Sequence, residues 1–258
     1  MVILYTVLLQ FFGHIQYTPA SRPILDEDIS LLVDTPEDIA VALNNADIRK
    51  VDYIAYSHWD PDHTLGMRIM EQLRLEWFDH YEGIKPQNPV RVLARPDVMS
   101  DIGQICSKYG PLLDYYEYMG LITRTVVESC IEIGGIRITF VPVTKGKAVT
   151  VFVFESNGNK LVYAPCDCKP FPDDDILKNA DMLIIGNTYI GNSHKNDRVI
   201  TDDHPLHKDL YSMDDVLEII ASKGVKNTIV THIEEDWGQI LFGLLGTGEA
   251  VYEHPICL

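Results

Sequence analysis

The chain has 258 residues, of which 46% are hydrophobic and 23% are charged, so we expect a soluble globular protein with a substantial core. Its formal net charge of −17 disfavours polyanionic partners, nucleic acid above all. The 5 cysteines are irregularly spaced, which excludes the disulfide framework of a small secreted protein and favours reduced thiols in the cytoplasm.

Short apolar strands alternate with helices in the first part of the chain. The apolar residues 1–12 lack the basic residues of a signal peptide and are too few to span a bilayer, so they are interpreted as a buried first strand, without membrane association. Pro36 is typical of the first turn of a helix. The elements predicted here are strands at 29–33, 51–56 and 91–94 and helices at 36–44, 64–75 and 96–109.

Strands dominate the second part of the chain. Asn157-Gly158 is a strong hairpin signal. Ser212 and Asp215 resemble a capping box at the start of a helix that Gly224 ends. The strands predicted here are 123–127, 136–143, 148–155, 160–164, 182–186 and 227–231. No repeat or linker interrupts the pattern, so we predict one domain over residues 1–258, of the α/β or α+β class.

A cluster of metal-binding residue types follows the strand at 51–56. Pro61 favours a turn there, which can direct the side chains toward one point. Imidazole nitrogens and carboxylate oxygens together suit zinc, manganese or iron rather than calcium. The alternative is a polar loop in which an acidic residue only caps the helix that begins at Thr64. The four candidate ligands are His58, Asp60, Asp62 and His63.

The segment His58-Trp59-Asp60-Pro61-Asp62-His63 resembles the H-x-H-x-D-H signature of the metallo-β-lactamase superfamily. Three further landmarks are similar to those of the family: the turn Asp34-Thr35-Pro36, Asp167 as the aspartate that bridges two metals, and His232 as the last ligand. The nearest likeness is the branch of cyclic-phosphate phosphodiesterases and tRNA 3′-processing nucleases. The resemblance implies a four-layer αββα sandwich and a divalent metal, zinc or manganese, with iron as a further candidate.

Two positions depart from the family pattern. Asp60 stands where the family has its second histidine, and no histidine lies between His80 and His194, so Lys145 occupies the place of another ligand. One metal site keeps Asp62, His63, Asp167 and His232, whereas the other is left with His58, Asp60 and the shared Asp167. Since an ammonium group repels a divalent cation, we favour one firmly bound metal, with two ions as the alternative.

The resemblance implies a hydrolase that attacks a phosphate ester of a small-molecule substrate. Asp62 would orient the attacking water, and Lys145 would stabilise the developing charge together with the metal. His204 or His207 would protonate the leaving oxygen, unless both are only solvent-facing loop residues. Cys166 and Cys168 flank Asp167, and core positions are expected for both.

Three other functions compete with this hypothesis. Asp60 is similar to the acidic residue in the H-x-E-x-D-H signature of flavodiiron proteins, which favours a redox di-iron protein, although the chain has no flavin domain. The altered ligands are also compatible with a non-catalytic metal-binding descendant. A tRNA nuclease is disfavoured by the acidic charge. A homodimer is common among relatives and stays an open expectation.

Overall fold

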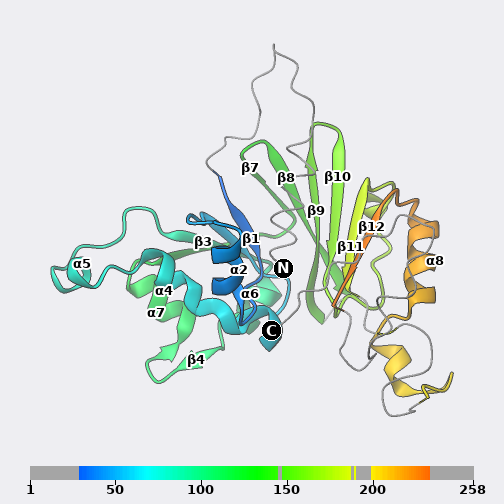
Figure 1. Cartoon of the computed structure of the whole chain (residues 1–258), viewed down its shortest axis with the longest axis horizontal. Helices are drawn as coiled ribbons and strands as arrows, with labels where there is room; N and C mark the ends of the chain where they lie inside the picture. Colours follow the sequence, from blue (N-terminus) through cyan, green and yellow to red (C-terminus); the bar gives the residue numbers. More distant parts are fainter. Residues whose placement is uncertain (1–28, 145–146, 187–188, 190–198, 233–258) are drawn as a thin grey trace. The chain divides into compact units, whose positions relative to one another are not determined.

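The computed structural model describes residues 29–144, 147–186, 189 and 199–232. The chain divides into two compact units, residues 1–140 and 141–258, and each is described by itself (Figure 1). The strand predicted within residues 1–12 lies outside the described residues. The prediction of a single domain stays a prediction.

A parallel four-stranded sheet forms the centre of the first unit, with the order β1-β2-β3-β6. Its strands are short and apolar, and Ile54 and Val92 at its centre have no exposed surface. Parallel neighbours need crossover connections, and helices supply them between successive strands. The strands are β1 (Leu31–Val33), β2 (Tyr53–Ala55), β3 (Val90–Ala94) and β6 (Ile122–Val126).

The helices of the first unit are shorter than the sequence pattern predicts. The predicted helix 64–75 begins earlier, at Pro61, and is divided by a 3-10 turn around Gly66. The predicted helix 96–109 is wrong beyond Ile102, because a small hairpin of β4 (Cys106–Ser107) and β5 (Gly110–Pro111) replaces its last turns. The helical elements are α2 (Ile39–Asn45), α3 (Pro61–Thr64), η1 (Leu65–Arg68), α4 (Ile69–Arg74), α5 (Trp77–Tyr81), α6 (Pro96–Ile102) and α7 (Leu112–Tyr118).

The second sheet has the strand order β12-β11-β10-β9-β8-β7. The predicted hairpin between β9 and β10 is confirmed, since Ser156 pairs with Asn159 and both turn residues, Asn157 and Gly158, have positive φ. β10, β11 and β12 run parallel, so their carboxyl ends share one edge. The strands are β7 (Cys130–Ile133), β8 (Ile136–Thr144), β9 (Lys147–Ser156), β10 (Asn159–Ala164), β11 (Met182–Gly186) and β12 (Thr228–Thr231).

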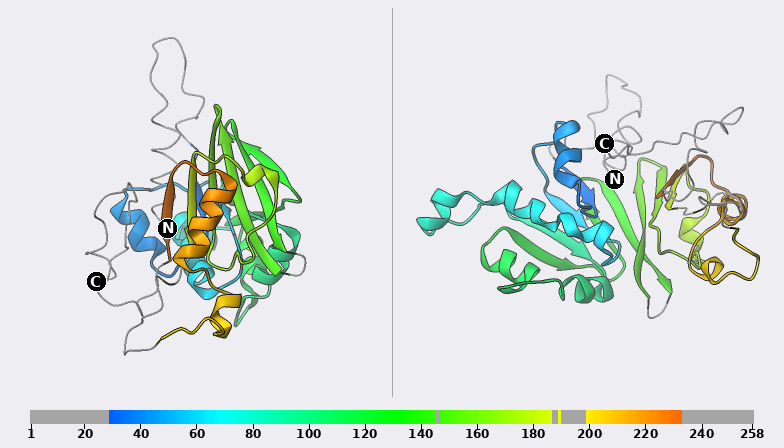
Figure 2. Two further views of the ribbon diagram at one scale, coloured as in Figure 1. Left: turned by 90° about the vertical axis from the view of Figure 1, so that its right-hand side faces the viewer. Right: turned by 60° about the horizontal axis from the view of Figure 1, so that its bottom comes forward.

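Helix α8 (Met213–Lys223) covers part of the sheet in the second unit (Figure 2). Its residues Val216 and Ile219 belong to one buried cluster with Val153 and Ile185 of the sheet. The predicted capping box is confirmed, and Gly224 ends the helix with φ 66°. Two 3-10 turns, η2 (Asp175–Leu177) and η4 (Pro205–Lys208), lie in the connections.

Both units combine helices and strands, which confirms the predicted α/β class. None of the helices in the described part of the chain has the length and apolar character needed to cross a membrane.

Candidate metal centre

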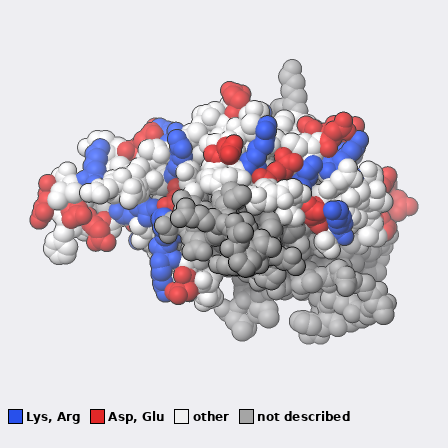
Figure 3. Space-filling view, turned by 90° about the horizontal axis from the view of Figure 1, so that it is seen from above, with Lys and Arg blue, Asp and Glu red and all other residues white. Residues whose placement is uncertain are grey.

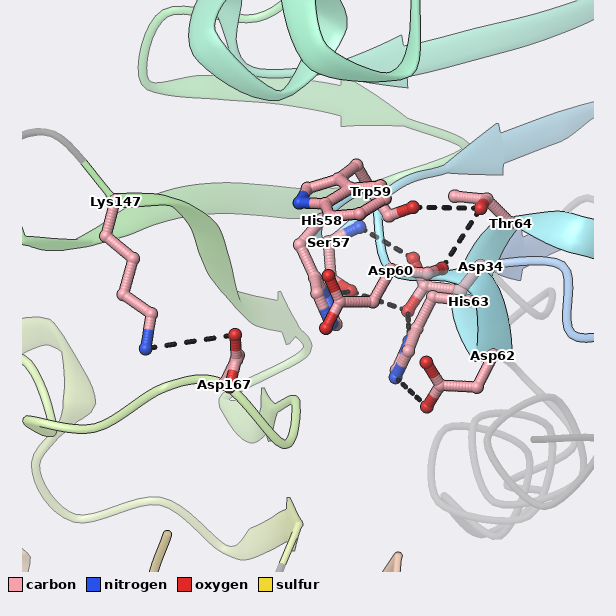
Figure 4. Close-up of polar contacts among 10 residues, drawn as sticks. All are labelled: Asp34, Ser57, His58, Trp59, Asp60, Asp62, His63, Thr64, Lys147 and Asp167. Carbon is pink, nitrogen blue, oxygen red and sulfur yellow. Dashed lines mark hydrogen bonds and ion pairs between the residues drawn. The ribbon is translucent and has the colours of Figure 1, made fainter. Parts of the chain in front are cut away.

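His58 and His63 of the first unit lie where the chain leaves β2 and turns into α3 (Figure 4). The Thr64 hydroxyl closes this turn by donating to the carbonyl groups of Trp59 and Asp60, at 2.9 and 3.0 Å. The turn brings the rings of His58 and His63 together, with their centroids 4.1 Å apart, and both residues are buried. The predicted turn is therefore present, and it pairs two histidines.

A buried carboxylate, Asp34, holds both histidines in place. Its Oδ1 accepts a hydrogen bond from the Ser57 backbone N–H at 2.6 Å. Its Oδ2 accepts from the Ser57 hydroxyl at 2.7 Å and lies 2.8 Å from His63 Nδ1. The Ser57 Oγ is in turn 2.8 Å from His58 Nδ1. Asp34 thus reaches one ring directly and the other through Ser57.

The hydrogen bonds define which ring nitrogens carry protons. An ionised carboxylate only accepts, so His63 Nδ1 donates to Asp34. The single hydroxyl proton of Ser57 goes to Asp34, so His58 Nδ1 must donate to Ser57 Oγ. In a neutral ring of this tautomer, the lone pair that binds a metal is on Nε2. Orientation of a ligand histidine by a carboxylate or hydroxyl through its other nitrogen is common in metal sites.

Acidic side chains stand beside both of these Nε2 atoms. Asp60 Oδ2 lies 3.7 Å from His58 Nε2, and Asp62 Oδ2 lies 3.3 Å from His63 Nε2. The Asp62 side chain is 47% exposed, whereas that of His63 is 4% exposed. The first unit therefore presents two oriented imidazoles and two carboxylates from one short segment.

The role of Asp34 was missed in the sequence, where its turn served only as a family landmark. Asp34 has φ 61°, a conformation that few residues other than glycine adopt, and aspartate is among those that tolerate it. The turn is joined to the motif by backbone hydrogen bonds from Thr35 N to His63 O and from Gly66 N to Thr35 O, at 2.8 and 2.9 Å. The sequence signal for this role was an acidic residue, Asp34, between an apolar strand and the Thr35-Pro36 turn.

In the second unit, the loop after β10 carries three residues with different surroundings. Cys168 is fully buried in the core, where burial raises the pKa of its thiol, so the predicted core position is confirmed. Cys166 is only half-buried and lies outside that core cluster. Its Sγ lies within 4.8 Å of a ring nitrogen of His232, which follows β12. Asp167 Oδ2 lies 3.9 Å from Lys147 Nζ (Figure 4).

Lys145, the predicted positive charge of the site, lies outside the described residues. Lys147, two positions later, was not singled out in the sequence. Besides its contact with Asp167, its ammonium group donates to the Lys169 carbonyl at 3.3 Å. The role predicted for Lys145 stays a prediction.

The two candidate proton donors, His204 and His207, lie at the 3-10 turn η4. The Nδ1 of His204 accepts from the Leu206 backbone N–H at 3.2 Å, and the residue is exposed. Both nitrogens of His207 have partners: Nδ1 lies 2.5 Å from the Tyr189 hydroxyl, and Nε2 lies 2.9 Å from the Thr201 carbonyl. His207 is thus held in the loop through both ring nitrogens, whereas the exposed His204 is held through Nδ1.

The donor atoms of the chain fit a divalent metal. The first unit offers imidazole and carboxylate groups, and the second offers the thiol of Cys166, the carboxylate of Asp167 and the imidazole of His232. Nitrogen, sulfur and carboxylate oxygen are the donors that zinc takes in proteins. Asp62, His63, Cys166 and His232 each present one such atom.

Comparison with known protein families finds a match over most of the chain. The model of the β-lactamase superfamily domain matches residues 30–233. No curated protein sequence matches the chain.

Three solved structures have the same fold at low sequence identity, which confirms the predicted metallo-β-lactamase fold. A diphosphatase of the PhnP family is 21% identical, with a TM-score of 0.58 over 80% of this chain and 69% of that one. The short form of human tRNase Z is 12% identical, with a TM-score of 0.57 over 79% and 81%. Zn²⁺-bound PqqB from Methylobacterium extorquens is 15% identical, with a TM-score of 0.54 over 81% and 74%.

Proposed function

This chain belongs to the β-lactamase superfamily, and we propose that it is a metal-dependent hydrolase that cleaves a small phosphate ester. The observation that carries the proposal is the pair His58 and His63, whose Nδ1 atoms are both engaged through Asp34 and Ser57. Burying these polar side chains costs free energy, and holding both rings in fixed orientations is what a metal site requires.

The proposed ligands follow the family pattern. Asp62 and His63 of the first unit and His232 of the second would hold one divalent ion, with a further ligand from the loop after β10, where the pattern indicates Asp167. When bound, the metal supplies Lewis-acid chemistry that polarises a phosphoryl oxygen and lowers the pKa of water. We favour one ion per chain, of zinc or manganese.

Each remaining step is assigned to a side chain. Asp62 is half-exposed beside the buried His63, so its carboxylate can orient a water molecule for attack on phosphorus. A lysine of the segment 145–147 would stabilise the charge that develops on the phosphoryl oxygens. His204 or His207 would protonate the departing oxygen.

The names of proteins that share this fold favour phosphate esters over acyl substrates. A diphosphatase and a tRNase Z share this fold with the chain. The acidic charge of −17 favours a small substrate over a polynucleotide.

The proposal is tested with purified protein loaded with zinc or manganese and assayed on bis-p-nitrophenyl phosphate. Asp62→Asn should lower kcat by about 10²–10⁴-fold, the usual contribution of a positioned base. Glu37→Gln, an exposed acidic site on the same unit, is the matched control and should keep full activity. Full activity in Asp62→Asn would refute the mechanism. Failure of the metal-loaded protein to cleave any phosphodiester would instead favour a non-catalytic protein, and bound iron with redox activity would favour the di-iron alternative.

A further inference from the structure

We infer that Cys166, rather than Asp167, supplies the metal ligand from the loop after β10, and that the resulting sulfur–nitrogen pair with His232 makes the site selective for zinc. The inference rests on the proposed metal-dependent function. It concerns the second unit alone and begins with its parallel strands.

Cys166 and His232 emerge at the same edge of the sheet. β11 lies between β10 and β12, and the register pairs Ala164 with Ile185 and Gly186 with Thr231. Cys166 comes two residues after the end of β10, and His232 comes directly after the end of β12. The two side chains therefore approach each other across the carboxyl end of β11.

Gly186, the last residue of β11, permits this approach. A Cβ atom at position 186 would lie 2.8 Å from the Cα and 2.9 Å from the N of Cys166, which is closer than a side chain can approach a backbone. The backbone at Cys166 thus packs directly on the end of β11, where only glycine leaves space. Its thiol is thereby placed within 4.8 Å of a ring nitrogen of His232.

Asp167 and Cys168 are engaged elsewhere in the same loop. The Asp167 carboxylate stands 3.9 Å from the Lys147 ammonium group, and Figure 4 shows the two side chains facing each other. Cys168 is buried with no exposed surface in the apolar core of the unit. Of the three side chains in this loop, that of Cys166 is the one beside the predicted last ligand.

The separation of the two donor atoms fits a zinc ion. Tetrahedral zinc with bonds of about 2.3 Å to sulfur and about 2.0–2.1 Å to nitrogen holds the two atoms about 3.6 Å apart, so a small side-chain movement completes the pair. Thiolate ligands favour zinc, whereas manganese prefers oxygen donors. The thiol gives its proton to solvent as the sulfur–metal bond forms, so metal binding releases one proton at this residue.

Cobalt(II), which replaces zinc and reports thiolate coordination by a near-ultraviolet charge-transfer band, provides the test in the full chain. The wild-type protein should show this band, and Cys166→Ser should lose it and bind zinc at least about 100-fold more weakly, more than the loss typical of outer-shell changes. Cys168→Ala and Asp167→Asn should both keep the band. Cys166→Asp should retain the visible cobalt bands without the charge-transfer band, which keeps the test valid where the serine variant folds poorly.

The outcomes separate this inference from the proposed function. Visible cobalt bands without a thiolate band in the wild-type protein, or loss of zinc affinity in Asp167→Asn alone, would overturn the role of Cys166 and leave the proposed hydrolase standing. Persistence of the thiolate band in Cys166→Ser would overturn it as well. Absence of any cobalt or zinc binding in the wild-type protein would overturn both proposals.

Discussion

Asp34 orients both histidine rings of the candidate site, because its carboxylate contacts His63 directly and His58 through the Ser57 hydroxyl. We predict that Asp34→Asn, which keeps the size but removes the charge, weakens metal binding by about 10–100-fold, the effect typical of an outer-shell partner of a ligand histidine. Competition with a chromogenic chelator measures the affinity.

The matched control for this substitution is Asp38→Asn. Asp38 is exposed, precedes helix α2 and makes no capping hydrogen bond with its side chain, so metal affinity should not change. Equal affinity in Asp34→Asn and the wild-type protein would show that the rings are oriented without the carboxylate and that the network serves stability alone.

His204 and His207 differ in their hydrogen bonds, which distinguishes their expected roles. Since His204 Nδ1 accepts a bond, its proton is on Nε2 and is available for transfer, whereas the Nε2 of His207 faces the Thr201 carbonyl. We predict that His204→Ala slows cleavage of esters with poorly acidic alcohols by about 10²-fold or more and spares p-nitrophenyl esters, whose leaving group needs no proton.

His207→Ala is expected to act on the loop instead. It removes one partner of the Tyr189 hydroxyl and one of the Thr201 carbonyl, which should lower the unfolding temperature and affect both ester classes equally. Kinetics with the two substrate classes distinguish the variants. A leaving-group dependence in His207→Ala and not in His204→Ala would reverse the assignment.

At single positions, candidate ligands could be recognised from the sequence, whereas the side chains that contact them could not. The ligand motif at 58–63 was recognisable because its spacing is compact. The roles of Asp34 and Cys166 depend on contacts with Ser57, His63 and His232 that are distant in sequence, and no local pattern reports such contacts. Family likeness indicated Asp167, and the orientation of its carboxylate toward Lys147 was not predictable without coordinates.

At the scale of elements, the motif depends on a close packing of α3 and η1 against the turn after β1. A Cβ atom on Gly66 would lie 1.9 Å from the carbonyl oxygen of Pro36, a backbone atom with little freedom to move. We predict that Gly66→Ala destabilises the protein by about 1–3 kcal/mol, the usual cost of overpacking. Because Gly66 and His63 bond to the same Thr35, metal affinity should fall as well.

Urea unfolding and metal titration measure the two effects. Leu65→Ala is the control, since Leu65 is 58% exposed and adjacent in sequence, and it should change both quantities little. Wild-type stability in Gly66→Ala would mean that the turn at Pro36 is free to move away from η1.

Strands were predicted more accurately than helices. Buried strands such as β10 and β11 are continuous apolar runs ended by polar or turn residues, so their bounds follow from local pattern. α7 was missed because its residues 112–118 include three tyrosines and two acids, a weak helical periodicity. The helix predicted at 96–109 extended past Gly103 and ended just before Gly110, which has φ 100° and begins β5.

At the scale of the whole molecule, charge decides which phosphate esters can approach. The chain carries a net charge of −17, and acidic and basic side chains are interspersed on the face shown in Figure 3, with no broad basic area among the described residues there. A polyanion is therefore repelled at long range, whereas a small ester with one or two charges is affected little.

The sign of the salt dependence tests this interpretation. Nucleases that bind through basic surfaces lose affinity steeply as salt rises, because released counterions drive the binding. For this protein, salt would instead screen repulsion, so any cleavage of a tRNA precursor should become faster between about 50 and 200 mM salt, where the Debye length shortens. We expect kcat/KM for a small diester to exceed that for the tRNA precursor by at least about 100-fold and to vary little with salt. Rates on the tRNA precursor that fall with salt would reveal a basic binding surface in the chain and would favour tRNA processing over cleavage of a small ester.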